Sequence, residues 1–169
     1  QATVTGQLSA VPYRASTKTI VWYPVAAFEE AVYEIPQTWD EMLALSDTTY
    51  EEQGVNPWCI CMEHGGVTGW VATDWVEDVL LRTAPPETYD AWVNHEIPFN
   101  DPAVLTAAEI VGDSWFNPDY VYGGYPGILT IFVAATPPPR LEDPPAVSLH
   151  RQAGRMPALW PDAPTPVVR

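Results

Sequence analysis

The chain has 169 residues, 47% of them hydrophobic and 17% charged, with 19 prolines, a composition that supports one globular domain with many proline-marked loops. The 22 acidic and 7 basic residues give a formal net charge of −15, which repels nucleic-acid phosphates and anionic membrane surfaces and leaves a neutral ligand open. As an alternative, the acidic excess only keeps the protein soluble. The sequence contains no run of about 18 apolar residues, the length needed to span a membrane.

The first predicted elements are short. Residues 4–9 indicate a strand and turn around Gly6, and residues 15–23 are rich in β-branched and aromatic side chains, which favours a strand. Pro24 ends this strand, and residues 25–32 follow as a short helix.

Thr38 and Glu41 form the clearest local signal, a capping box that starts a helix. This helix is expected to end at Gly54, and residues 58–62 follow as a buried strand. A glycine-containing loop is expected over 63–72.

Three further helices are predicted, each from a cap residue or an early proline. They begin after Thr73 or Asp74, at Pro86 and after Asp101, and they end near Arg82, Asn94 and Phe116. Residues 128–134 and 147–152 favour strands with a proline-rich connection between them. Strands that alternate with capped helices predict an α/β fold with three or four strands and about five helices.

Cys59 and Cys61 lie two positions apart in the strand predicted over 58–62. Their side chains would share one face with Cα atoms about 6.5 Å apart, near the upper limit for a disulfide. Buried thiols are therefore expected, and no metal-ligand spacing or cofactor motif accompanies them.

The sequence contains no motif of an enzyme active site. Its many acidic residues still allow a pair of carboxylates that could hydrolyse glycosides. No Gly-x-Ser-x-Gly or phosphate-binding loop occurs, and the three histidines are far apart. Acids at helix starts are explained as caps, so a binding role is favoured over catalysis.

Aromatic residues make up 12% of the chain. Sugars are bound by flat aromatic faces together with a few placed hydrogen-bonding groups. Thr68, Gly69 and Trp70 offer this combination just before a predicted helix start, where amide groups are free to donate. For Trp70, packing in the core is an equal alternative. The tryptophans expected in the core are Trp39, Trp75, Trp92 and Trp115.

Several segments in order resemble the carbohydrate-binding proteins of ABC importers, extracellular solute-binding protein family 1, in its alpha-glucoside-binding branch. The similarity runs from about residue 6 to 162, and the segments that carry it are 11–23, 33–41 with Pro-Gln-Thr-Trp-Asp-Glu, 57–60, 68–78, 92–101 and 149–152 with Leu-His-Arg-Gln.

The resemblance implies a type II periplasmic-binding-protein-like fold, in which two α/β lobes joined by a hinge close on a sugar. Residues 1–14 would end a first-lobe strand and cross the hinge, residues 15–156 would form an incomplete second lobe with a small mixed sheet flanked by helices, and residues 157–169 a proline-rich tail. Since two lobes need about 300 residues, the chain is expected to be a fragment, without its export signal.

The resemblance also implies a site. Trp70 would be the stacking platform, with polar contacts from Thr68 and Gly69. Tyr13 and Arg14 would face the ligand from the hinge strand, although Arg14 serves equally well in an ion pair.

Three more residues complete this implied site. Tyr122 lies in a glycine-rich turn that could be a turn alone, and His150 and Arg151 lie at a strand end where a structural hydrogen bond is an equal alternative. Relatives place a cysteine just before Leu149 that could pair with the residue matching Cys59, and this chain has none there.

The function expected from the resemblance is the carbohydrate-binding component of an ABC importer, periplasmic or anchored at the cell surface. Its expected partners are a neutral, alpha-glucoside-like sugar and the membrane subunits of the permease, with no nucleic acid. A dimer of the fragment through its exposed cleft or missing-lobe surface is a further expectation. The alternatives are a glycoside-active enzyme fragment and a truncated remnant that binds nothing.

Overall fold

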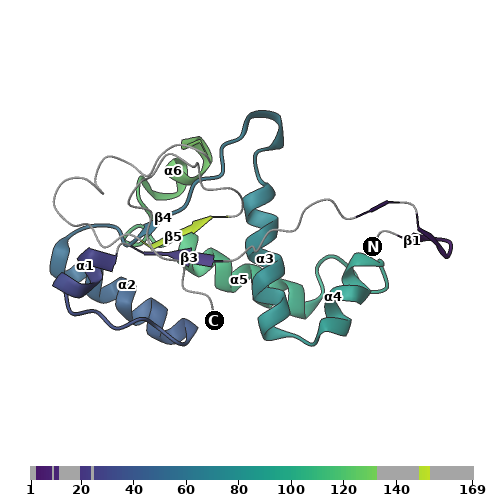
Figure 1. Ribbon diagram of the computed structural model, residues 1–169, viewed down its shortest axis with the longest axis horizontal. Coiled ribbons are helices and arrows are strands. Elements are labelled where there is room, and N and C mark those ends of the chain that lie inside the picture. Colours follow the sequence, from purple (N-terminus) through teal and green to yellow (C-terminus); the bar gives the residue numbers. More distant parts are fainter. Residues whose placement is uncertain (1–2, 9, 12–19, 24, 133–148, 153–169) are drawn as a thin grey trace.

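The computed structural model describes residues 3–8, 10–11, 20–23, 25–132 and 149–152. Helices dominate these residues, and the largest sheet has three short strands (Figure 1). The helices are α1 (Val25–Glu30), α2 (Trp39–Gln53), α3 (Trp70–Thr83), α4 (Pro86–Val93), α5 (Pro102–Trp115) and α6 (Gly124–Thr130), with a 3-10 turn, η1, at Gly65–Val67. The strands are β1 (Thr3–Val4), β2 (Gln7–Leu8), β3 (Ile20–Trp22), β4 (Trp58–Cys59) and β5 (Leu149–Gln152).

The three-stranded sheet is mixed, in the order β3-β5-β4. The central strand β5 runs antiparallel to β3, with Val21 opposite Arg151, and parallel to β4, with Cys59 opposite His150. β1 and β2 form a separate antiparallel hairpin around Thr5 and Gly6. The small mixed sheet among helices agrees with the coarse prediction. The predicted strand residues 15–19 and 147–148 lie outside the described part of the chain.

Local capping signals are confirmed. The Thr38 hydroxyl accepts the Glu41 amide at 3.2 Å, while the Glu41 carboxylate accepts the Thr38 amide at 3.2 Å, and α2 ends at Gly54 in the left-handed conformation. The Asp101 carboxylate likewise accepts the Ala103 amide at 2.9 Å at the start of α5. These interactions join residues within one helical turn, which is why the sequence alone identifies them.

The start of α3 differs from the prediction, because the helix begins at Trp70 and not after Thr73 or Asp74. Gly69 is the N-terminal cap, at φ 110°, and its carbonyl accepts the Ala72 amide at 2.9 Å. The Thr73 hydroxyl donates to the Trp70 carbonyl at 2.7 Å inside the helix. A cap without a polar side chain is not visible as a capping motif, so the predicted start falls too late.

The strand predicted over 128–134 is also wrong for its first part, because Ile128 to Thr130 belong to α6. Gly123, at φ 74°, caps this helix, and Pro126 falls in its first turn. Amide groups in the first turn have no partner within the helix, so the helix loses no hydrogen bond because proline lacks an N–H. Extended backbone begins at Ile131, and Phe132 forms an isolated parallel bridge with Glu63. Residues 133–134 lie outside the described ranges. Propensity for strand is here overridden by local glycine and proline geometry.

The core contains a column of indole rings. The rings of Trp58 and Trp75 meet edge to face with centroids 5.9 Å apart, and Trp75 meets Trp115 in the same way at 5.6 Å. Around them pack Leu80, from α3, and Ile128, both fully buried.

The two cysteines agree with the expectation of buried thiols. Cys59 and Cys61 are both buried and are not joined by a disulfide; their sulfur atoms lie 3.8 Å apart. This distance is far longer than the roughly 2 Å of a disulfide bond.

None of the helices in the described ranges has the length and apolar character that a membrane crossing requires.

Candidate functional site

The loop that joins β4 to α3 is held in shape by its own polar groups. The Thr68 hydroxyl accepts the His64 amide at 2.8 Å and donates to the Gly65 carbonyl at 2.8 Å. The Glu63 carboxylate accepts the Gly65 amide at 2.6 Å. Thr68 thus closes the loop around η1. The sequence predicted Thr68 as a ligand contact and did not predict this structural role.

Gly69 gives the loop its exit into α3. At φ 110° its backbone adopts a conformation that L side chains rarely take, although a Cβ atom there would meet nothing within 4 Å. The requirement for glycine at this position is therefore one of backbone geometry, and it brings Trp70 to the first position of the helix.

Trp70 is half-buried, with part of its surface packed against the core. Its indole N–H donates to Nδ1 of the exposed His64 at 3.2 Å. The His64 ring in turn meets the ring of Phe132, which is also exposed, edge to face at 5.6 Å. We call these three residues, His64, Trp70 and Phe132, the aromatic rim. It offers flat apolar surface beside polar backbone, the combination that suits a sugar.

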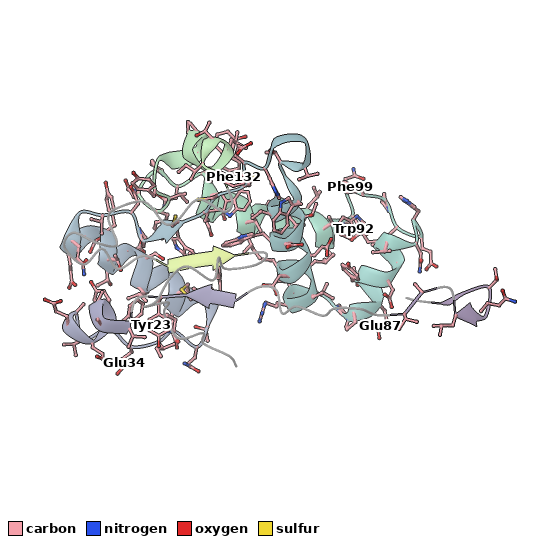
Figure 2. The ribbon with its side chains drawn as sticks, turned by 45° about the horizontal axis from the view of Figure 1, so that its top comes forward. Tyr23, Glu34, Glu87, Trp92, Phe99 and Phe132 are labelled. Atoms are coloured by element: carbon pink, nitrogen blue, oxygen red, sulfur yellow. The ribbon has the colours of Figure 1, made fainter. Side chains whose placement is uncertain are left out.

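The aromatic rim is assembled from two distant parts of the chain. The Met62 amide donates to the Ile128 carbonyl at 2.9 Å and the Glu63 amide to the Ile131 carbonyl at 3.1 Å, so the end of α6 is tied to the start of the loop. Figure 2 shows Phe132 beside α6. Sequence analysis missed His64 and Phe132: His64 stands next to two glycines, which could have marked it, whereas nothing local marks Phe132.

The predicted site residues are brought together in part. Thr68, Gly69 and Trp70 form one continuous turn. Tyr122 is half-buried just before α6, and its amide donates to the Trp58 carbonyl at 2.9 Å, along β4. His150 pairs with Cys59 on the other edge of β4.

The backbone of Arg151 pairs with Val21 of β3. Tyr13 and Arg14 lie outside the described residues. As ligand contacts, all eight predicted residues stay predictions.

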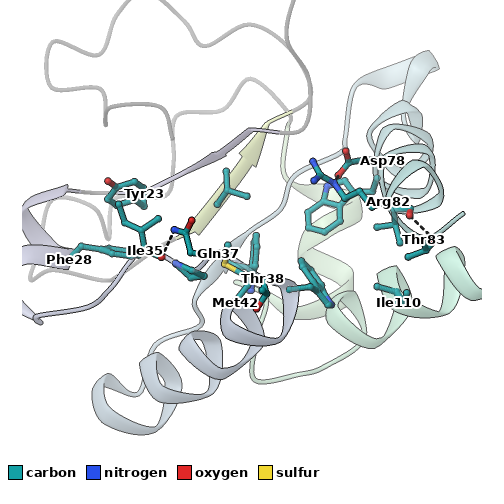
Figure 3. A pocket seen from close by; sticks show the side chains of 16 residues that line it. Tyr23, Phe28, Ile35, Gln37, Thr38, Met42, Asp78, Arg82, Thr83 and Ile110 are labelled. Atoms are coloured by element: carbon teal, nitrogen blue, oxygen red, sulfur yellow. Dashed lines mark hydrogen bonds and ion pairs between the residues drawn. The ribbon is translucent and has the colours of Figure 1, made fainter. Parts of the chain in front are cut away.

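A second candidate site is a pocket of about 350 Å³ beside the middle and last turns of α3, away from the helix start at Trp70 (Figure 3). It lies between β3 and α1 on one side and α3 on the other, with the start of α2 at its base. Indole rings of Trp39, Trp58 and Trp75 line it, together with Tyr23 and Phe28. Its volume falls in the range of about 300–1,000 Å³ that is usual for small-molecule sites.

Polar groups stand on the α3 side of this pocket. Nε of Arg82 lies 3.1 Å from the Asp78 carboxylate, and the Arg82 side chain is 67% exposed, against 15% for Asp78. An exposed pair of this kind contributes about 0–1 kcal/mol to stability, but it places a fork of donors beside an aromatic wall. Sequence analysis assigned Trp39 and Trp75 to the core and so missed the pocket.

Within the described part of the chain, no group of three or more His, Cys, Asp or Glu side chains is placed to hold a metal ion.

The chain is similar to known binding proteins over nearly all of its length. No protein-family model matches it. It is 46% identical over 95% of its length to the osmoprotective compounds-binding protein GgtB of Synechocystis, and 45% identical over 94% to the alpha-glucosides-binding periplasmic protein AglE of Rhizobium meliloti. An uncharacterized ABC transporter extracellular-binding protein of Pyrococcus horikoshii is 26% identical over 60% of the chain.

The chain is homologous to solute-binding proteins of ABC transporters. It spans 38% of the length of GgtB and 34% of the length of AglE. The homology therefore concerns one segment of these solute-binding proteins. Both relatives are named for the compounds they bind and not for a reaction, in agreement with the expectation of a binding role.

Proposed function

We propose that this chain is a carbohydrate-binding segment of a solute-binding protein that delivers its ligand to an ABC importer. The identity to AglE, named for alpha-glucosides, supports a sugar, and the identity to GgtB, named for osmoprotective compounds, supports such compounds as a related ligand class. The net charge of −15 favours a neutral ligand over an anionic one. A location in the periplasm or outside the cell is part of this proposal, and it is supported by AglE, which is named a periplasmic protein, and by the extracellular-binding protein of Pyrococcus horikoshii.

The proposed arrangement is a two-lobe type II fold. Residues 1–14 would cross the hinge, residues 15–156 would form most of the second lobe, and residues 157–169 a tail. The mixed sheet of β3, β5 and β4 with its surrounding helices would be the centre of that lobe. Ligand binding would then require the facing lobe, and the membrane subunits of the permease would receive the closed protein. A dimer of this segment stays a prediction, because neither the fold nor the relatives bear on it.

The observation that carries the proposed site is the half-buried indole of Trp70 at the start of α3. The ring is hydrogen-bonded to exposed His64, whose ring in turn meets exposed Phe132, and it follows a loop with amide groups at a helix start. A sugar's C–H face can stack on such a ring while its hydroxyls bond to nearby polar groups. Core packing is the alternative for Trp70, since part of its ring packs against the core, as Trp39 and Trp92 also do.

The test is a fluorescence and calorimetric titration with maltose, sucrose and trehalose, performed on the longest protein that carries this sequence and on the 169-residue chain. We expect a saturable response in the longest protein that Trp70→Ala abolishes, and a weaker response in the 169-residue chain tested alone, since the facing lobe would contribute to binding. The matched control is Trp39→Ala, which removes a wall of the pocket and should leave the affinity within about two-fold.

Three outcomes would count against this proposal. A response lost with Trp39→Ala and kept with Trp70→Ala would place the sugar in the pocket. No response to any sugar in the longest protein would contradict carbohydrate binding. Turnover of a chromogenic glycoside, lost on substitution of one carboxylate, would favour the enzyme alternative.

A further inference from the structure

The hydrogen bond between Trp70 and His64 determines the form of the histidine. The indole N–H can only donate, so Nδ1 of His64, 3.2 Å away, is the acceptor. A neutral imidazole with an unprotonated Nδ1 carries its proton on Nε2. In this form the His64 ring, which is exposed, presents an N–H donor on the side away from Trp70.

The His64 ring is held from more than one side. Its backbone amide donates to the Thr68 hydroxyl at 2.8 Å, which anchors the residue in the loop. Its ring packs edge to face on Phe132 at 5.6 Å, with an angle of 73° between the planes. Contacts of this geometry restrict ring rotation, so the histidine can fix the orientation of its partner indole.

We propose that His64 is the positioning residue of this site: through Nδ1 it orients the stacking face of Trp70, and through Nε2–H it donates to an oxygen of the neutral ligand. This inference rests on the proposed sugar site and goes beyond it, because it names a residue that sequence analysis did not single out. It also selects the ligand chemistry, since a donor at Nε2 requires an acceptor such as a hydroxyl or ring oxygen.

The experiment compares His64→Asn with His64→Phe, because the asparagine oxygen occupies a position similar to Nδ1 and can accept from Trp70, whereas phenylalanine keeps a ring without either nitrogen. Affinity for the sugar that gives the strongest response is measured for wild type and both variants. Loss of one hydrogen bond corresponds to about ten-fold weaker binding. We expect this loss in His64→Asn, which lacks the donor at Nε2, and a larger loss in His64→Phe, which lacks both hydrogen bonds.

A second readout needs no ligand and separates this inference from the proposed function. The emission of Trp70, obtained as the difference between each protein and its Trp70→Phe counterpart, should shift in His64→Phe, where the indole N–H loses its acceptor, and stay close to wild type in His64→Asn. Unchanged Trp70 emission in His64→Phe, or wild-type affinity in His64→Phe, would overturn the inference even if Trp70→Ala abolishes sugar binding. A shifted emission in His64→Phe without any sugar response would uphold the His64–Trp70 coupling and count against the sugar site.

Discussion

Trp70 and Trp75 lie on the same helix, α3, yet they occupy opposite environments. Trp75 is 1% exposed and is enclosed by Trp58 and Trp115 in the indole column. Trp70 is half-buried at the first position of the helix, and its N–H is directed to an exposed histidine. Two identical side chains on one helix thus lie in two environments, one enclosed by other rings and one half-exposed at the start of the helix.

The difference comes from where each part of α3 lies. The middle and last turns of α3 pack against α5, and Trp75 also meets Trp58 of β4. Residues of the same turns line the pocket. The first position follows a glycine loop that lies at the edge of the fold beside α6 (Figure 1). A ring buried on all sides, such as that of Trp75, must fit the shape of its neighbours, whereas a half-buried ring, such as that of Trp70, has a face that a ligand can cover. Three predictions sharpen this comparison, from the largest expected effect to the smallest.

The largest effect is expected from Trp75→Ala. Removing a fully buried indole leaves a cavity between two other rings, and the cost is about 3–5 kcal/mol of unfolding free energy. Trp70→Ala is the matched variant and should cost about 1–2 kcal/mol, because only part of the ring is buried. Urea unfolding of the 169-residue chain measures both values. Equal losses would mean that Trp70 belongs to the same core and would remove the basis of the comparison.

An intermediate effect is expected at the connection between α2 and the turn before α6. The hydroxyl of buried Tyr120 donates to the Asp47 carboxylate at 2.7 Å. Burial, and then this hydrogen bond, raise the pKa of Tyr120 to about 12. Tyr120→Phe should cost about 1–2 kcal/mol near neutral pH, since one hydrogen bond to a charged group is lost.

The pH dependence of stability checks the same residue. Between pH 10 and pH 12 an unfolded tyrosine loses its proton, whereas Tyr120 in the folded chain keeps it. The unfolded state is therefore favoured as pH rises through this range, and stability falls. The fall should be shallower in Tyr120→Phe than in wild type and unchanged in Tyr125→Phe, an exposed control on α6. Identical slopes in all three proteins would contradict the assignment.

The smallest effect is expected from Thr38→Ala, at the start of α2 on the pocket side. The variant removes the hydroxyl that accepts the Glu41 amide, and loss of such a cap costs about 1 kcal/mol. Thr106→Ala, on an exposed turn of α5, removes a hydroxyl bonded to a carbonyl of its own helix and should change stability by less than about 0.5 kcal/mol. A shift in sugar affinity with Thr38→Ala, and none in stability, would link the pocket and not the aromatic rim to binding.

The sequence alone determined where the capped helices α2 and α5 begin. Thr38 with Glu41, and Asp101 before Pro102, interact within one turn of helix, so residue type and spacing are enough to place α2 and α5. Short-range signals of this kind do not depend on the rest of the chain. The resemblance to solute-binding proteins is likewise carried by the order of short sequence segments, and the homology upholds it.

Only the tertiary structure determined the uncapped helix starts and the contacts between residues that are distant in sequence. The start of α3 at Trp70 and the helix α6 depend on glycine backbone conformations at Gly69 and Gly123 that carry no capping side chain. The contact of His64 with Phe132 and the pocket wall join residues that are distant in sequence. Local propensity carries no information about such partners, because their proximity arises only when the helices pack on the sheet and the chain returns to close the core.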